Sequence, residues 1–229
     1  MERRMLGVLG GMGPLASAEF MRRLTLLTPA GRDQDHIPAV LWSDPRVPDR
    51  TAGRRSGGED PLPALLRGIR GLVAAGAGAI AIPCNTAHGW FEAMQAATAL
   101  PILHIVAAAA EELARLGVAR GPVGVMGTAG TLAMRLYQQR LETRGYRCEL
   151  PGEAEMEALV TPGIALVKAN RVAEAARGAK AVVLGCTEIP LGIAAGPALP
   201  FPVCDTLDAL ARAAIRWARP GTESEKALC

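Results

Sequence analysis

The sequence predicts an α/β protein with parallel sheets, made of two similar halves that are related by a pseudo-two-fold axis. Short runs of small and β-branched apolar residues at 79–82 and 181–184 are typical of parallel strands covered on both faces. A strand, a glycine-rich turn and a helix, followed later by a strand that ends in cysteine, occur twice along the chain. This repeat indicates an internal duplication. It predicts that the two cysteines, Cys84 and Cys186, face each other across the cleft between the halves.

Length and composition fit this class of fold. The chain has 229 residues, which allows one large or two small α/β domains. Half of the residues are apolar and only 3% are aromatic, so the core must be built from Ala, Val, Leu and Ile. We expect residues 1–104 together with 205–229 to form the first domain, and residues 105–204 to form the second.

The charge balance limits the kinds of binding partner that we expect, and the cysteine content indicates the cellular compartment. The 25 basic and 22 acidic residues give a net charge of +3, too even a balance to indicate nucleic acid or a membrane surface as partner. Arg54 and Arg55 lie among Gly and Ser, which indicates a solvated loop. The N-terminus lacks the features of a signal peptide, and no run approaches the roughly 18 apolar residues of a membrane span. Five cysteines, none in a CxxC pair, favour a cytoplasmic protein with reduced thiols.

The first strand is predicted at 5–9 and runs into the turn Gly10-Gly11-Met12-Gly13-Pro14. Glycines let the backbone turn sharply and approach a ligand, and Pro14 suits the first turn of the helix expected at 15–27. Position 16 is Ala, and no acidic residue lies where it could bind a ribose, so the turn is not a dinucleotide fingerprint. A small carboxylate near Met12 and Gly13 fits this turn better, because a helix N-terminus attracts anions.

The second strand, at 39–43, leads into a proline-stiffened loop at 44–51. Arg46 and Arg50 in this loop are candidate carboxylate clamps, since a guanidinium offers a planar bidentate fork. The alternative is that both are ordinary solvated arginines, and the stiffness of the loop favours Arg50 as the clamp. A flexible stretch at 53–63 then leads to a helix at 62–76.

The predicted strands at 79–82 and 181–184, which we call the cysteine strands, are ended by Pro83 and Gly185, and small polar residues follow each cysteine. A cysteine there would lie at the carboxyl end of a strand, where open α/β sheets bind their ligands. The turn Gly127-Thr128-Ala129-Gly130-Thr131 repeats the first glycine turn in the second half. The remaining elements are predicted as strands at 101–106, 123–127 and 200–204, and as helices at 87–97, 107–116, 132–144, 153–159, 163–176 and 207–217. The stretch 221–229 is expected to be disordered.

Several roles are open to two such cysteines. A disulfide is disfavoured in a cytosolic chain, and a zinc site would need more ligands at short spacing, so no metal is expected. A single nucleophile with His88 as its base would make a hydrolase. Buried cysteines are most often structural, so this is the default interpretation of Cys84 and Cys186. Both follow a predicted strand within a duplicated pattern, however, and this argues against a coincidence.

The remaining role is proton transfer by two thiols. Inversion at a carbon needs one group to remove a proton and another to deliver one from the opposite face. A following helix N-terminus can lower a thiol pKa from its usual value of about 8.5. Asn85, Thr86, Thr187 and backbone N–H groups could hold a substrate carboxylate and offset the developing carbanion charge. No cofactor is needed for this chemistry.

Together these motifs resemble the cofactor-independent aspartate/glutamate racemases, and the resemblance covers nearly the whole chain. It rests on Gly10–Pro14, Pro48-Asp49-Arg50-Thr51, Pro83-Cys84-Asn85-Thr86-Ala87-His88, Gly127–Thr131 and Gly185-Cys186-Thr187-Glu188-Ile189-Pro190-Leu191. The match is nearest to the aspartate racemase branch, because glutamate racemases typically have histidine where Glu188 stands. The resemblance implies two Rossmann-like domains, an active site between them and a homodimer that acts on a small amino acid.

The resemblance also implies a role for individual residues. Cys84 and Cys186 would be the two acid/base groups, while Arg50 and Lys168 would bind the side-chain carboxylate of the substrate. Further substrate contacts are expected at Thr128, Thr131 and Glu188. Residues 132–138 depart from the lysine-serine-glycine stretch often present in the family, so breadth of substrate stays open. The expected activity is racemisation of aspartate, perhaps also of glutamate; a broad-specificity racemase, a cysteine hydrolase and a non-catalytic carboxylate-binding protein are the alternatives.

Overall fold

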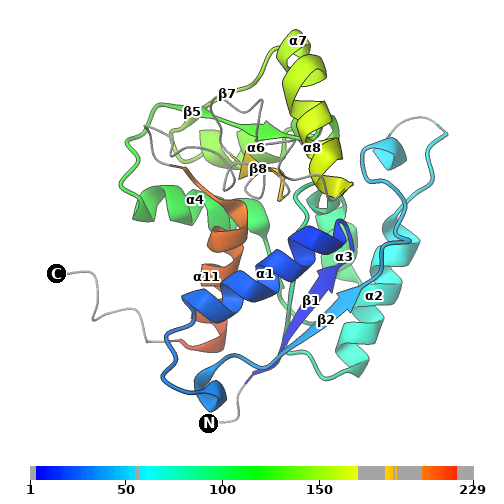
Figure 1. Cartoon of the computed structure of the whole chain (residues 1–229), viewed down its shortest axis with the longest axis vertical. Helices are drawn as coiled ribbons and strands as arrows, with labels where there is room; N and C mark the ends of the chain where they lie inside the picture. The colour runs from blue at the N-terminus through cyan, green and yellow to red at the C-terminus, as the bar shows by residue number, and fades with distance from the viewer. Residues whose placement is uncertain (1–3, 55–56, 170–183, 188, 190–202, 221–229) are drawn as a thin grey trace.

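The computed structural model describes residues 4–54, 57–169, 184–187, 189 and 203–220, and it has two α/β lobes (Figure 1). The first lobe contains a parallel sheet with strand order β2-β1-β3-β4. Its strands are β1 (Leu6–Gly10), β2 (Ala39–Ser43), β3 (Ala79–Ala81) and β4 (Ile102–Leu103). Val8 of β1 is paired with Leu41 on one side and with Ala81 on the other.

Helices cover both faces of this sheet, because its strands are apolar on both sides. On one face, Leu6 and Val8 pack against α1 (Pro14–Leu27), α4 (Ile105–Arg115) and α11 (Thr206–Ala218). On the other face, Leu9 and Ile80 pack against α2 (Leu62–Ala74) and α3 (Phe91–Ala96). The carboxyl ends of β1 and β3 therefore emerge from a rigid three-layer core.

The second lobe repeats the pairing pattern of the first. Its strands are β5 (Pro122–Gly124), β6 (Met126–Gly127), β7 (Arg147–Glu149) and β8 (Leu184–Gly185), with β5 parallel to β7 and β6 parallel to β8. Just as β1 lies between β2 and the cysteine strand β3, the β5–β6 segment lies between β7 and the cysteine strand β8. The helices α5 (Ala129–Ala133), α6 (Leu136–Glu142), α7 (Glu153–Glu155) and α8 (Thr161–Lys168) complete the lobe. This agrees with the predicted pseudo-two-fold fold.

Side-chain capping and backbone breaks account for the largest differences from the predicted elements. The strand predicted at 101–106 is limited to β4, because the His104 ring accepts a hydrogen bond from the Val106 N–H (3.2 Å) and starts α4 early. The helix predicted at 87–97 begins as a 3₁₀ turn, Thr86–Trp90, before α3. The helix predicted at 132–144 is interrupted at Arg135, whose φ of 54° lies in the left-handed region.

The other differences lie in the second lobe. Strand β7 is absent from the predicted elements because its three residues, Arg147-Cys148-Glu149, alternate between polar and apolar over too short a run to indicate a strand. The helices predicted at 153–159 and 163–176 form one run through α7, a π-helical turn (Met156–Val160) and α8, and residues from 170 onward lie outside the described residues. Of the strand predicted at 200–204, the described Val203 and Cys204 are not in a strand. The stretch 221–229 also lies outside the described residues. None of the helices described is both long and apolar enough to cross a membrane.

The glycine turn after β1 requires glycine at Gly11, and its replacement should be costly. Gly11 has a φ of +91°, and a Cβ atom there would lie 2.4 Å from the backbone of Asp44. We expect Gly11→Ala to lower the free energy of unfolding by on the order of 3 kcal/mol, because backbone strain and a clash add together. Gly57→Ala is the matched control: its φ is +81° but nothing lies within 4 Å, so only the strain applies. Equal midpoints of urea unfolding for the two variants would contradict this prediction.

Candidate active site

Cys84 lies in the loop that follows β3, as the sequence predicts. The residue is 5% exposed and packs with the apolar residues of α2 and α3. Its N–H donates to the Ile82 carbonyl (2.8 Å), so the backbone turns immediately after the strand. Asn85 and Thr86 follow at the start of the 3₁₀ turn and are equally buried. The local sequence explains this: Pro83 ends the strand, and a short polar run starts the turn.

Three threonine hydroxyls join the two lobes next to Cys84. The Thr86 Oγ1 atom lies 2.8 Å from Thr128 Oγ1 and 2.9 Å from Thr131 Oγ1, and the last two are 3.0 Å apart. Thr128 caps α5 by accepting a hydrogen bond from the Thr131 N–H (3.1 Å). A Cβ atom on Gly130 would lie 2.8 Å from Thr51 Oγ1, so only glycine permits this close contact between α5 and the first lobe. We call Thr86, Thr128 and Thr131 the threonine cluster.

Strand register brings Cys186 to the same cluster. Gly127 is paired with Gly185, so Cys186 follows β8 at the level at which Thr128 follows β6. Cys186 and Thr187 are 3% and 1% exposed. Burial raises the pKa of Tyr137 well above its usual value, and the nearby Cys204 and Cys186 thiols raise it further. The hydroxyl of that same tyrosine donates to Asn85 Oδ1 (2.5 Å), the neighbour of Cys84. Cys84 and Cys186 thus each lie at a strand end close to a member of the threonine cluster, Cys84 two residues before Thr86 and Cys186 at the level of Thr128.

His88 is not arranged as a base for Cys84. Its Nδ1–H donates to the Cys84 carbonyl oxygen (2.9 Å), and its Nε2 accepts the Ile105 N–H (3.2 Å). Both ring nitrogens are therefore used by the backbone, and the imidazole is the neutral Nδ1–H tautomer. The ring holds the cysteine loop to the start of α4, and this argues against a Cys–His hydrolase.

Burial lowers the pKa of His88 to about 4, and we expect this to be visible in solution. The unfolded chain binds a proton near pH 6.5 and the folded chain only near pH 4. The unfolding free energy should therefore fall by roughly 3 kcal/mol from this group as the pH drops from 6.5 to 4. The proton NMR signals of the His88 ring should keep their neutral positions down to about pH 5. A titration midpoint near 6.5 would contradict the hydrogen bonds described above.

Arg50 is held as a buried cation at the end of the first glycine turn. Its Nη1 donates to the Val47 and Pro48 carbonyls (3.2 and 3.1 Å), and its Nη2 donates to the Met12 carbonyl (3.2 Å). The Nε atom is buried and has no partner, and none of the ion pairs in the described part of the chain includes Arg50. A buried guanidinium with an unpaired N–H group can bind an anion, although the charge of Arg50 also interacts with Asp49 and contributes to lowering the pKa of that carboxyl. The Met12 side chain itself is part of the core, so only its backbone faces this site.

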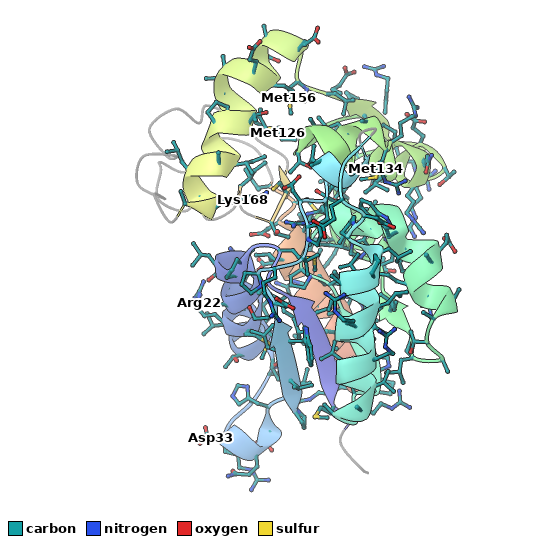
Figure 2. The ribbon with its side chains drawn as sticks, turned by 90° about the vertical axis from the view of Figure 1, so that its right-hand side faces the viewer. Arg22, Asp33, Met126, Met134, Met156 and Lys168 are labelled. Atoms are coloured by element: carbon teal, nitrogen blue, oxygen red, sulfur yellow. The ribbon has the colours of Figure 1, made fainter. Side chains whose placement is uncertain are left out.

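A second cation approaches the same loop from the other lobe. Lys168 Nζ lies 3.9 Å from Asp49 Oδ2, the residue before Arg50. Figure 2 shows Lys168 at the end of α8 that faces the first lobe. Asp49 also accepts the N–H groups of Thr51 and Ala52 (2.9 and 2.8 Å), which fixes the loop. The ion pair therefore connects the helix of one lobe to the arginine loop of the other.

The other predicted site residues have mixed outcomes. Arg46 is not at the site: it is exposed and forms an ion pair with Asp44 (2.8 Å), because two residues along a loop are close enough to pair locally. Arg54 is not simply solvated, since its guanidinium lies 4.3 Å above the Trp90 ring and donates to the Gly89 carbonyl. Gly13 caps α1, and its carbonyl accepts the Ser17 hydroxyl (2.8 Å). Glu188 and Arg55 lie outside the described residues.

Sequence reasoning did not find Tyr137 or Thr206 as site residues. Tyr137 donates to Asn85 Oδ1, and Asn85 Nδ2 donates to Thr206 Oγ1 (3.3 Å). Tyr137 follows no predicted strand, and the only available hint is that it is one of two tyrosines in the chain. Thr206 comes two residues after the strand predicted at 200–204, so its position after a strand end could have indicated it. The described residues contain no group of three or more His, Cys, Asp or Glu side chains arranged to hold a metal ion.

The remaining described cysteines have structural surroundings. Burial raises the pKa of Cys204 to about 12, and its Sγ lies 3.5 Å from the Ala109 carbonyl oxygen. Burial likewise raises the pKa of Cys148 to about 11. None of the four described cysteines forms a disulfide, so Cys84 and Cys186 are reduced thiols.

Comparison with known proteins agrees with this arrangement. A family model for the Asp/Glu/hydantoin racemases matches residues 9–214. A broad-specificity amino-acid racemase of Bacillus subtilis (strain 168) is 32% identical over 145 residues, which cover 62% of each chain. The match thus spans less than two thirds of that relative.

Solved structures extend the similarity to the whole fold. The aspartate racemase of Picrophilus torridus superposes with a TM-score of 0.81 at 30% identity and covers 94% of both chains. An aspartate racemase homologue from Pyrococcus horikoshii OT3 has a TM-score of 0.69 at 23% identity, covering 94% of this chain and 99% of its own, and shares the fold. The chain therefore belongs to the Asp/Glu/hydantoin racemase family.

Proposed function

We propose that the protein is an amino-acid racemase that works without pyridoxal phosphate or another cofactor, with aspartate as its main substrate and glutamate as a second. The observation that carries this proposal is the threonine cluster, which joins the turn after Cys84 to the residues that follow β6, the strand paired with the cysteine strand β8. In the proposed two-base inversion, Cys84 and Cys186 would approach the substrate carbon from opposite faces.

The reaction needs no redox change and no leaving group other than a proton. One cysteine, as thiolate, removes the α-proton from one face of the substrate, and the other, as thiol, delivers a proton to the opposite face. The net charge of the pair is unchanged, and the roles of Cys84 and Cys186 exchange with the direction of reaction. The Asn85 amide and the hydroxyls of Thr86, Thr128, Thr131 and Thr187 would hold the α-carboxylate and stabilise the carbanion charge.

The preference for an acidic amino acid is supported by two cations. Three carbonyl oxygens orient the buried guanidinium of Arg50 and accept three of its five N–H groups; the N–H of Nε is among those that remain. Lys168 lies beside the same loop through Asp49. A second carboxylate on the substrate would complete the hydrogen bonding of Arg50 and balance its charge. Glu188, two residues after Cys186 in the sequence, would contribute to the choice of substrate.

One experiment tests this function. L- and D-aspartate are each incubated with the purified protein in deuterated water without pyridoxal phosphate, and proton NMR follows the α-proton while chiral chromatography follows inversion. We expect loss of the α-proton signal together with the opposite enantiomer. Running glutamate, alanine and lysine in parallel distinguishes an acidic-substrate racemase from a broad-specificity one, which the name of the Bacillus relative suggests. No exchange with any amino acid would leave a carboxylate-binding protein as the explanation.

We also propose that the protein is a cytoplasmic homodimer with domains at 1–104 plus 205–229 and at 105–204. The packing of α11 on α1 supports the assignment of the C-terminal segment to the first domain: Arg23 of α1 binds both Asp205 and Asp208, the second at 2.6 Å. Helix α4, although it follows residue 104, also packs on the sheet of the first lobe. Light scattering coupled to gel filtration measures the oligomeric state directly.

A further inference from the structure

Tyr137, Asn85 and Thr206 form a closed hydrogen-bonded group where three elements meet. The Tyr137 hydroxyl donates to Asn85 Oδ1 (2.5 Å), and Asn85 Nδ2 donates to Thr206 Oγ1 (3.3 Å). Thr206 also hydrogen-bonds the Tyr137 hydroxyl. All three are at most 2% exposed. They come from α6 of the second lobe, from the turn after Cys84 and from the start of α11.

The hydrogen bonds of this group distinguish the two ends of the Asn85 amide. An amide side chain can rotate by half a turn and exchange an acceptor for a donor at the same place. Both partners are hydroxyls, which can donate or accept, but a phenol is the stronger donor, and this favours the observed orientation, in which Tyr137 donates to Oδ1 and Nδ2 donates one hydrogen to Thr206. The second hydrogen of Nδ2 takes part in neither of these hydrogen bonds. A donor at this place suits a carboxylate, whereas an exposed carbonyl oxygen would repel one.

The position of Tyr137 depends on the break between α5 and α6. Arg135, with its φ of 54°, turns the chain one residue before α6, and Tyr137 is the second residue of that helix. The left-handed conformation is unfavourable for a non-glycine residue, so surrounding contacts must hold it. Figure 2 shows Met134 on the side of the second lobe that faces the first, and its Sδ packs so closely that a Cβ on Gly89 would lie 2.2 Å away. The break therefore directs α6 toward the cysteine loop.

We propose that Tyr137 is a positioning residue for the racemase: from the second lobe, it holds the Asn85 side chain with its N–H donor toward the substrate carboxylate. This rests on the proposed function, in which Asn85 binds substrate beside Cys84. In this proposal a residue of the second lobe, Tyr137, orients a substrate-binding residue of the first lobe, Asn85. Tight substrate binding would then require the two lobes to be correctly packed.

The chain provides a matched pair of variants. Tyr137 and Tyr146 are its two tyrosines, and both are buried in the same apolar core with hydrogen-bonded hydroxyls, Tyr146 to the Val118 carbonyl (3.4 Å). We expect Tyr137→Phe to lower kcat/KM for aspartate by 10- to 100-fold, with most of the change in KM, and Tyr146→Phe to change it by less than 2-fold. In an Asn85→Ala background, Tyr137→Phe should have no further effect, because it acts through Asn85.

An NMR measurement makes the proposal independent of activity. The Asn85 side-chain amide signals, assigned by their loss in Asn85→Ala, should shift in Tyr137→Phe and stay unchanged in Tyr146→Phe. Unchanged Asn85 signals, or effects of Tyr137→Phe and Asn85→Ala on kcat/KM that simply multiply, would overturn the positioning role. If instead the unmodified protein exchanges no α-proton, the proposed function fails, while the amide signals still decide whether Tyr137 orients Asn85.

Discussion

Replacing either Cys84 or Cys186 by serine should lower the rate of racemisation by about 10³-fold or more. A serine hydroxyl has almost no basic form at neutral pH, and a positioned general acid or base contributes roughly 10²- to 10⁴-fold. Each variant keeps one thiol, which can remove and return a proton on its own face. We therefore expect Cys84→Ser and Cys186→Ser to keep slow α-deuterium exchange with opposite enantiomers of aspartate, measured by proton NMR in deuterated water.

The control for this pair is Cys148→Ser. Cys148 is half-buried on β7, and burial raises the pKa of its thiol to about 11, so it is not expected to take part. This variant should racemise aspartate within 2-fold of the unmodified protein. Full activity in Cys84→Ser or Cys186→Ser would reject the two-base scheme. Exchange of the same enantiomer by both variants would also reject it, because the two thiols would then act on one face.

Arg50→Gln should lower kcat/KM for aspartate by roughly 10²-fold, the second largest effect that we expect. A hydrogen bond between charged groups contributes about 1.5–3 kcal/mol, and each 1.4 kcal/mol corresponds to a factor of ten in rate. The variant also leaves the carbonyls of Met12, Val47 and Pro48 without their donor, so a lower midpoint of thermal unfolding is expected alongside. Kinetics must be measured well below that midpoint.

Arg46→Gln is the control, because Arg46 lies in the same loop but is exposed and pairs with Asp44. It should leave kcat/KM for aspartate unchanged. If Arg50 binds the side-chain carboxylate, Arg50→Gln should reduce turnover of aspartate more than turnover of alanine. Equal losses for both amino acids would assign Arg50 to the α-carboxylate instead. A folded Arg50→Gln protein with the kinetics of the unmodified protein would exclude both roles.

The strand-end cysteines illustrate how much of the site local sequence predicts. The apolar run before Pro83 predicts a strand that ends there, and the cysteine that follows is therefore expected at the carboxyl ends of the strands of the sheet. The same reasoning predicted the glycine turn, where only glycine adopts the φ of Gly11 at low cost. For Arg50 and Arg46, by contrast, the sequence gives only a preference for Arg50 from the stiffness of the loop, and the structure separates them: Arg50 is buried among carbonyls and Arg46 pairs with Asp44.

Sequence by itself therefore determined the α/β class, the duplicated pairing pattern and the place of Cys84 at the end of its strand, because these depend on hydrophobic runs and helix breakers within a few residues. Only the tertiary structure decided that Thr86 contacts Thr128 and Thr131, and that Tyr137 donates to Asn85. It also decided that both nitrogens of His88 bind backbone. Such contacts join residues that are distant along the chain, and they depend on how two lobes pack and which rotamers the packing allows, which no local pattern encodes.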